Sequence, residues 1–226
     1  MVLIARIKLN ITDEPIYKPG DMNAMFENIF ERFSHYNPTA LSTPKDGPDK
    51  PWVVTFENFL THEEVDAIIA TNTHFERSTD TGTSNEFGET GRVLSQGRTS
   101  SNSWCRDECR SHPLVQSAVN KIVEVTGVPS ENYESFQVLK YELGQRYTVH
   151  HDYGQKDREL ISGPRILTFF LYLSDVEEGG ETAFPNLGIA VPPRKGKALL
   201  WPSTLDADPS TQDPRYVFLH TNTLKK

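Results

Sequence analysis

His150 and Asp152 lie two residues apart in an apolar-rich segment that reads Tyr147-Thr148-Val149-His150-His151-Asp152. On a β-strand, side chains at i and i+2 leave the same face, so this pair can point into one cavity and bind one metal ion. A second histidine would complete the two-histidine, one-carboxylate set that holds Fe(II) and leaves positions open for a co-substrate and dioxygen. His220 is the only histidine downstream.

Other interpretations of the same residues remain open. A His-x-Asp triplet also occurs by chance as a solvated turn or a hydrogen-bonded surface pair. A zinc hydrolase would use the same ligand types, but it would also need a nearby carboxylate as general base. His151 faces away from His150 in a regular strand, so we expect it to have a structural role.

The composition indicates one acidic domain with a sizeable core. The chain has 226 residues and a net charge of −8, which argues against a nucleic-acid surface. It has no run of 18 apolar residues, and the apolar opening is too short for a convincing signal peptide. Cys105 and Cys109 can form a small disulfide loop in an oxidising compartment or remain two reduced thiols.

The elements that must position the pair begin with helices. Apolar residues recur at three and four over 21–33, which predicts a helix with one apolar stripe. The polar segment 37–51 is typical of a linker, so we expect residues 1–50 to form an N-terminal helix and linker and residues 51–226 to form the main domain.

Within the main domain, residues 52–56 predict a strand, and a Thr-x-x-Glu capping box at Thr61 to Glu64 predicts the start of a helix. A second helix is expected over 113–126, ending at Gly127. The polar segment 79–91 predicts a mobile surface loop that could cover a substrate.

After residue 133 the pattern changes to short extended runs separated by Gly, Pro, Asp and Asn. This pattern is typical of a double-sheet jelly roll or cupin-like barrel. We therefore expect an α+β fold, a double-stranded β-helix core with supporting N-terminal helices. The expected strands are 136–141, 165–173, 183–184, 189–191 and 198–201.

From Pro51 to about Pro214 the chain resembles the prolyl 4-hydroxylases, which are Fe(II)- and 2-oxoglutarate-dependent dioxygenases. The matching landmarks occur in order along this whole stretch. They are Val53 to Leu60, Arg98-Thr99-Ser100, Gln137 to Tyr141, the Tyr-x-x-His-x-Asp of 147–152, Gly163 to Thr168, Tyr172 to Thr182 and Lys195 to Trp201.

The resemblance implies that His150 and Asp152 bind iron together with a distal histidine, for which His220 is the candidate. It implies hydroxylation of a proline-containing peptide or protein to 4-hydroxyproline, coupled to oxidative decarboxylation of 2-oxoglutarate to succinate, with L-ascorbate as reductant. It also implies a location in the endoplasmic reticulum or secretory pathway, although no signal peptide is visible.

The resemblance also assigns roles to residues around the metal. Tyr141 and Tyr147 match positions where the family places tyrosines near the co-substrate, and ordinary core aromatics are the other interpretation. Thr168 is a hydroxyl in an otherwise apolar strand and could bind the co-substrate by donating to a carboxylate, or it is an ordinary strand threonine. Strand parity puts Tyr147 on the opposite face from His150 unless the strand bends or bulges. Arg98, Glu134 and Arg165 match positions at the peptide groove or its supporting shell.

The C-terminal part departs from the family pattern. Phe218 occupies the place of the ligand histidine, and His220 is displaced by two residues, or about 6–7 Å along a strand. The lysine that the family uses for the distal carboxylate of 2-oxoglutarate is missing. Lys225 and Lys226 lie only five and six residues past His220 on a chain end expected to fray, and Arg165 and Lys197 are the other candidates to replace it. The closing strands are also missing, so we expect an unpaired strand edge and an open barrel interior. The alternative function is a catalytically silent homologue that binds proline-rich peptide or a partner subunit.

Overall fold

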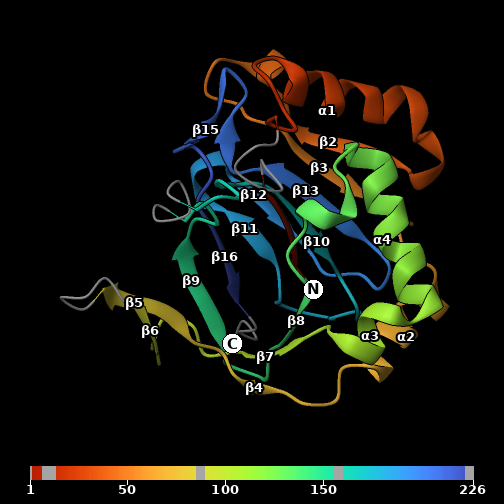
Figure 1. Ribbon diagram of the computed structural model, residues 1–226, viewed down its shortest axis with the longest axis vertical. Coiled ribbons are helices and arrows are strands. Elements are labelled where there is room, and N and C mark those ends of the chain that lie inside the picture. Colours follow the sequence, from red (N-terminus) through yellow and green to blue (C-terminus); the bar gives the residue numbers. More distant parts are fainter. Residues whose placement is uncertain (1, 7–13, 85–89, 155–159, 222–226) are drawn as a thin grey trace.

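The computed structural model describes residues 2–6, 14–84, 90–154 and 160–221. Two antiparallel sheets face each other, and helices gather on the outer side of the larger sheet (Figure 1). This is the jelly-roll core with supporting helices that the strand pattern predicted. No helix in the described ranges is long and apolar enough to cross a membrane.

The helices and strands follow the chain in a mixed order. The helices are α1 (Asp21–Arg32), α2 (His62–Ala70), α3 (Asp107–Ser111) and α4 (Pro113–Thr126), with short 3-10 turns at Ser34–Tyr36, Pro44–Asp46, Ser130–Asn132 and Pro185–Leu187. The early strands are β1 (Val2–Arg6), β2 (Pro38–Ser42), β3 (Val53–Phe56), β4 (Glu76–Arg77), β5 (Asp80–Ser84), β6 (Thr90–Val93), β7 (Ser101–Trp104) and β8 (Gln137–Lys140). The later strands are β9 (Arg146–His150), β10 (Arg165–Leu171), β11 (Thr182–Phe184), β12 (Ile189–Val191), β13 (Ala198–Pro202), β14 (Thr204–Leu205), β15 (Asp208–Gln212) and β16 (Phe218–Thr221).

The large sheet has eight strands in the order β2-β3-β13-β10-β1-β8-β7-β4, and the small sheet has four in the order β12-β11-β16-β9. The pairs β14-β15 and β5-β6 form separate two-stranded ribbons. Because β10 sits in one sheet and β9 in the other, residues from the two strands meet across the space between the sheets.

Local sequence signals explain the helices. The apolar stripe of α1 is buried at Met22, Met25, Phe26 and Ile29. The Thr61 hydroxyl and the Glu64 carboxylate form the predicted capping box that starts α2. The helix α4 has the predicted bounds and ends where Gly127 adopts a left-handed φ of 69°.

Strand β10 separates two cores by the alternation of its side chains. Leu167, Phe169 and Leu171 pack under the helices, whereas Phe170 packs between the two sheets with Trp201 and other apolar residues. Thr168 lies on the same side as Phe170 and is fully buried. This alternation carries a hydroxyl into the space between the sheets.

The strand β1 lies between β10 and β8 and pairs antiparallel with both. In its register, Ile4 lies opposite Thr168, and Val2 lies opposite both Phe170 and Gln137. The prediction of an unpaired edge left by missing closing strands is therefore wrong for β10 and β8. The chain's N-terminal segment pairs with β10 over the whole of Val2–Arg6 and with β8 at Val2 and Gln137.

Two further predictions, a linker over 37–51 and a loop over 79–91, are tested by the described residues. The expected linker over 37–51 contains β2, which pairs with β3, so this segment is part of the large sheet. The expected loop over 79–91 is wrong where β5 and β6 pair as a ribbon, and residues 85–89 lie outside the described part. The division into residues 1–50 and 51–226 stays a prediction, although α1 packs into the same core as β10.

The two cysteines form a disulfide. Cys105 and Cys109 are bonded to each other across the start of α3. Of the two states that the spacing left open, the structure has the oxidised one.

Candidate metal centre and active site

His150 is held in place from both sides of β9. On one side Phe218 of β16 lies opposite His150. On the other side Thr148 N donates to Gly97 O at 2.8 Å, and Thr99 N donates to Arg146 O at 2.8 Å. The strand that carries the histidine is therefore fixed by hydrogen bonds to two different segments.

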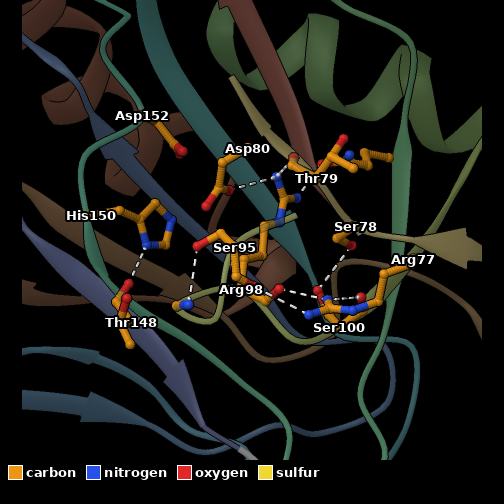
Figure 2. Close-up of polar contacts among 12 residues, drawn as sticks. Arg77, Ser78, Thr79, Asp80, Ser95, Arg98, Ser100, Thr148, His150 and Asp152 are labelled. Carbon is orange, nitrogen blue, oxygen red and sulfur yellow. Dashed lines mark hydrogen bonds and ion pairs between the residues drawn. The ribbon is translucent and has the colours of Figure 1, made fainter. Parts of the chain in front are cut away.

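The His150 ring presents one free nitrogen to the cavity between the sheets. Its Nδ1 lies 2.7 Å from the Thr148 carbonyl oxygen (Figure 2). Because a carbonyl can only accept, Nδ1 carries the hydrogen and Nε2 keeps its lone pair. Burial lowers the pKa of His150 below its usual value, although Asp152 and the Thr148 carbonyl act in the opposite direction. The ring is therefore neutral at pH 7 and able to bind a metal.

Asp152 lines the same cavity as His150. Its Oδ2 accepts a 2.6 Å hydrogen bond from Thr168 Oγ1 on β10. That bond fixes the carboxylate and leaves Oδ1 for a second interaction. An imidazole nitrogen and a carboxylate oxygen from one segment thus line the same cavity, with His150 at the end of β9 and Asp152 in the bend that follows it. Figure 2 shows both side chains with the neighbouring polar residues.

A β-bulge places Tyr147 on the same side as His150. Phe218 lies opposite His150, but His220, two residues further on, lies opposite Tyr147, three residues back along β9. The extra residue on β9 reverses the alternation. The Tyr147 ring therefore stacks on the His150 ring with centroids 3.5 Å apart. This bulge is the condition that the sequence analysis required for Tyr147 to lie at the site.

The cavity is about 450 Å³, and its partly exposed lining residues Arg98, Glu134 and Arg165 define the side that we call the mouth. At this mouth Arg165 donates to Glu134, from Nε to Oε1 at 3.1 Å and from Nη2 to Oε2 at 3.4 Å. The Arg98 guanidinium lies 4.5 Å from the Tyr147 ring centroid and donates to Gln137 Oε1 at 3.1 Å. Figure 2 shows the Arg98 guanidinium beside Asp80 and Thr79. The three predicted substrate residues therefore line one opening.

Comparisons with known proteins agree with this geometry. The sequence profile of the 2OG-Fe(II) oxygenase superfamily matches residues 136–220. The probable prolyl 4-hydroxylase 8 of Arabidopsis thaliana is 33% identical over 234 residues, with 88% of this chain and 76% of the relative covered. The chain belongs to the prolyl 4-hydroxylase family.

A second relative and a solved structure show how much of each chain is similar. The prolyl 4-hydroxylase subunit alpha-1 of Gallus gallus is 33% identical over 175 residues, which cover 73% of this chain but only 33% of the relative. The viral collagen prolyl hydroxylase of Paramecium Bursaria Chlorella virus-1, solved as a 2OG complex, matches with a TM-score of 0.54 and 22% identity. The match covers 74% of this chain and 86% of the viral one and supports the shared fold.

His220 lines the cavity but lies too far from His150 for a compact prolyl 4-hydroxylase metal site. Their ring centroids are 6.0 Å apart. Two imidazoles bound to one metal at right angles through bonds of about 2.1 Å would have centroids roughly 4.5 Å apart. Phe218 contacts His150 instead, with centroids 4.3 Å apart. The described residues contain no group of three His, Cys, Asp or Glu side chains that could hold a metal.

Neither predicted substitute for the family lysine reaches the interior. Lys197 Nζ pairs with Glu57 Oε1 at 3.0 Å, and Lys197 does not line the cavity. Arg165 is bound to Glu134 at the mouth. Tyr141 lies 6.2 Å from His220 between ring centroids, and burial raises its pKa to about 12, so its hydroxyl keeps its proton.

Two further outcomes concern residues outside the ligand pair. His151 lines the cavity beside His150, and both of its ring nitrogens are engaged: Nε2 lies 2.8 Å from Asp213 O, and Nδ1 accepts from Tyr153 N at 2.8 Å, contacts that suit the expected structural role. The sequence analysis did not select Trp201 or Phe170 as cavity residues. The alternation of side chains along β13 and β10 could have indicated that these two residues share a face. It identifies a cavity only when the sheet that packs against that face is known.

Proposed function

We propose that this chain hydroxylates peptidyl proline to 4-hydroxyproline, coupled to conversion of 2-oxoglutarate to succinate. The observation that carries the proposal is the convergence of His150 Nε2 and the Asp152 carboxylate on one cavity inside a jelly roll. Family membership makes iron the metal, and the neutral imidazole and the carboxylate are ligand types that suit it. Bound Fe(II) and 2-oxoglutarate would supply the oxidising chemistry that amino-acid side chains lack.

The chain's own contribution is binding, orientation and exclusion of water. Thr168 holds Asp152 and the Thr148 carbonyl holds His150, so both ligands are oriented before metal arrives. Stacked Tyr147 covers one face of the His150 ring. Phe170, Trp201 and Phe218 line the inner wall with apolar surface, which keeps water from the reacting centre.

The mouth of the cavity supports a peptide as the substrate. Arg165 and Glu134 form an ion pair at the mouth, and Arg98 and Trp104 line the same cavity. Side chains with fixed donors and one flat aromatic surface suit an extended backbone and a proline ring. We propose a proline-containing peptide or protein as substrate and L-ascorbate as the reductant that keeps the iron in its working state.

The direct experiment incubates the protein with Fe(II), 2-oxoglutarate, ascorbate and a proline-rich peptide. We expect a mass gain of one oxygen on the peptide and an equal amount of succinate. A peptide with every proline replaced by alanine is the matched control and should give neither product. Peptide binding without succinate, unchanged in His150→Ala, would instead support the silent homologue.

We also propose a secretory location. The disulfide between Cys105 and Cys109 supports it, because such bonds persist mainly in oxidising compartments. Localisation of a tagged full-length protein tests this, and a cytosolic signal with both thiols reduced would contradict it.

A further inference from the structure

The inner end of the cavity is built around His220. The ring is 5% exposed and stacks on Phe170 with centroids 4.8 Å apart. Its Nδ1 lies 3.1 Å from Thr182 Oγ1, and Thr182 is fully buried on β11. His220 is thus fixed by a neighbour in its own sheet, with its Nε2 edge left for another partner.

The hydrogen bonds around Thr182 decide which nitrogen of His220 carries the hydrogen. Tyr172 Oη donates to Thr182 Oγ1 at 2.8 Å and lies 3.4 Å from the Val191 carbonyl oxygen. The shorter bond takes the tyrosine hydrogen, so the buried Thr182 hydroxyl needs an acceptor for its own hydrogen. His220 Nδ1 at 3.1 Å is the acceptor that the described residues offer, and we assign the Thr182 hydrogen to it. Burial holds the pKa of His220 well below its usual value, so the ring is neutral. A neutral ring that accepts at Nδ1 is a donor at Nε2 and has no lone pair there for a metal.

The indole nitrogen of Trp201 is a second donor at the inner end of the cavity. Trp201 is fully buried on β13 and lines the cavity, and its Nε1 makes no hydrogen bond within the described part of the chain. A buried donor without an acceptor costs about 1–3 kcal/mol, so a bound group that accepts from it is favoured. Trp201 and His220 both lie against Phe170, with ring centroids 6.5 Å and 4.8 Å from it.

The cations that line the cavity are already engaged. Among the described residues these are Arg77, Arg98 and Arg165. Arg165 is bound by Glu134, and Arg77 donates to the carbonyl oxygens of Ser95 and Ser100. Arg98 donates to Thr79 O and Gln137 Oε1 through its terminal nitrogens and lies 3.9 Å from Asp80 Oδ1, although its buried Nε makes no hydrogen bond within the described residues. The buried nitrogen donors that His220 and Trp201 offer at the inner end therefore belong to aromatic rings.

We propose that His220 is not the third metal ligand but binds, together with Trp201 Nε1, the distal carboxylate of 2-oxoglutarate. This inference rests on the proposed function, because it names the residues that would recognise that reaction's co-substrate. A carboxylate between two N–H donors satisfies the orphaned indole and gives the His220 Nε2 hydrogen an acceptor. The metal then has two protein ligands, His150 and Asp152.

The test separates metal binding from carboxylate binding under anaerobic conditions. Calorimetric titrations measure the affinity for Mn²⁺, and then the affinity of the Mn²⁺-loaded protein for 2-oxoglutarate and for 2-oxobutyrate, which lacks the distal carboxylate. We expect Trp201→Phe and His220→Phe to weaken 2-oxoglutarate binding by roughly tenfold or more, as loss of a hydrogen bond to a charged group does. Mn²⁺ and 2-oxobutyrate affinities should change less than about twofold.

Controls keep the outcomes distinct. Trp52→Phe removes a buried indole that lies outside the cavity and donates to Asn23, so it should change none of the three affinities, and circular dichroism checks that each variant is folded. Loss of Mn²⁺ binding in His220→Phe to the extent seen in His150→Ala would overturn the inference, and so would unchanged 2-oxoglutarate affinity in both inner variants. Wild-type protein that binds neither Mn²⁺ nor 2-oxoglutarate would overturn the proposed function and the inference with it.

Discussion

The Thr168 hydroxyl donates to Asp152 Oδ2 at 2.6 Å across the space between the two sheets. This bond joins β10 to the segment that follows β9 and orients the carboxylate at the candidate metal centre. We expect Thr168→Val to weaken Mn²⁺ binding by about 10-fold or more, the range found for residues that orient metal ligands. Calorimetric titration with Mn²⁺ measures the affinity of each variant. Thr168→Ser keeps a hydroxyl and should retain most of the affinity, and equal affinities in wild type and Thr168→Val would contradict the assigned role.

The position of β1 between β10 and β8 can be tested by a disulfide. Ala5 lies opposite Leu167, and paired residues in antiparallel strands have Cα atoms about 4.5–5.5 Å apart, within disulfide range. We expect Ala5→Cys/Leu167→Cys to cross-link on mild oxidation, as read by peptide mapping without reduction. Leu3→Cys/Leu167→Cys is two residues out of register and should stay reduced. Equal cross-linking of both pairs would contradict the observed register.

The neutral state of buried His220 predicts how stability depends on pH. Its pKa in the folded protein is well below the usual value, whereas the unfolded chain has a histidine pKa of about 6.5. Stability from this group is fully present above about pH 6.5 and falls by up to about 1.4 kcal/mol per pH unit below it, because only the unfolded state takes up the proton.

Urea unfolding at pH 7.5 and pH 5.0 measures this dependence. We expect His220→Gln to lose less stability than wild type between the two pH values, since glutamine does not titrate. If both proteins lose the same free energy of unfolding, His220 is not the group responsible.

The contact between Gly97 and Thr148 holds the Arg98 segment against β9. A Cβ on Gly97 would lie 2.8 Å from Thr148 Oγ1, closer than such atoms approach. We expect Gly97→Ala to lower the free energy of unfolding by about 1–3 kcal/mol. Adding Thr148→Ala removes the clashing oxygen and should restore most of that loss, as measured by urea unfolding. A double variant no more stable than Gly97→Ala would place the cause elsewhere.

Parts of the site with a short-range signal were predictable from the sequence. The i and i+2 spacing of His150 and Asp152 placed both residues in one short segment, in which β9 carries His150 and the bend just after it carries Asp152. The bounds of α4 followed from its apolar periodicity and from Gly127. These features depend on neighbours within a few residues, which a sequence shows directly.

Features that depend on distant partners could not be predicted in the same way. The bulge that brings Tyr147 beside His150 arises from the register between β9 and β16. The insertion of β1 between β10 and β8 needs three segments that are far apart in the chain. Periodicity predicts that a segment is a strand, but not which strand lies next to it.

The central claim is that His150 and Asp152 form the metal centre of a 2-oxoglutarate-dependent hydroxylase. The most direct measurement is anaerobic calorimetric binding of Mn²⁺, followed by 2-oxoglutarate, to wild type, His150→Ala and His151→Ala. We predict that His150→Ala loses Mn²⁺ affinity by more than about 100-fold, beyond the loss from a supporting residue, and no longer binds 2-oxoglutarate. His151→Ala, the neighbouring histidine that bonds Asp213, should retain both. Mn²⁺ and 2-oxoglutarate affinities in His150→Ala that match wild type would contradict the account.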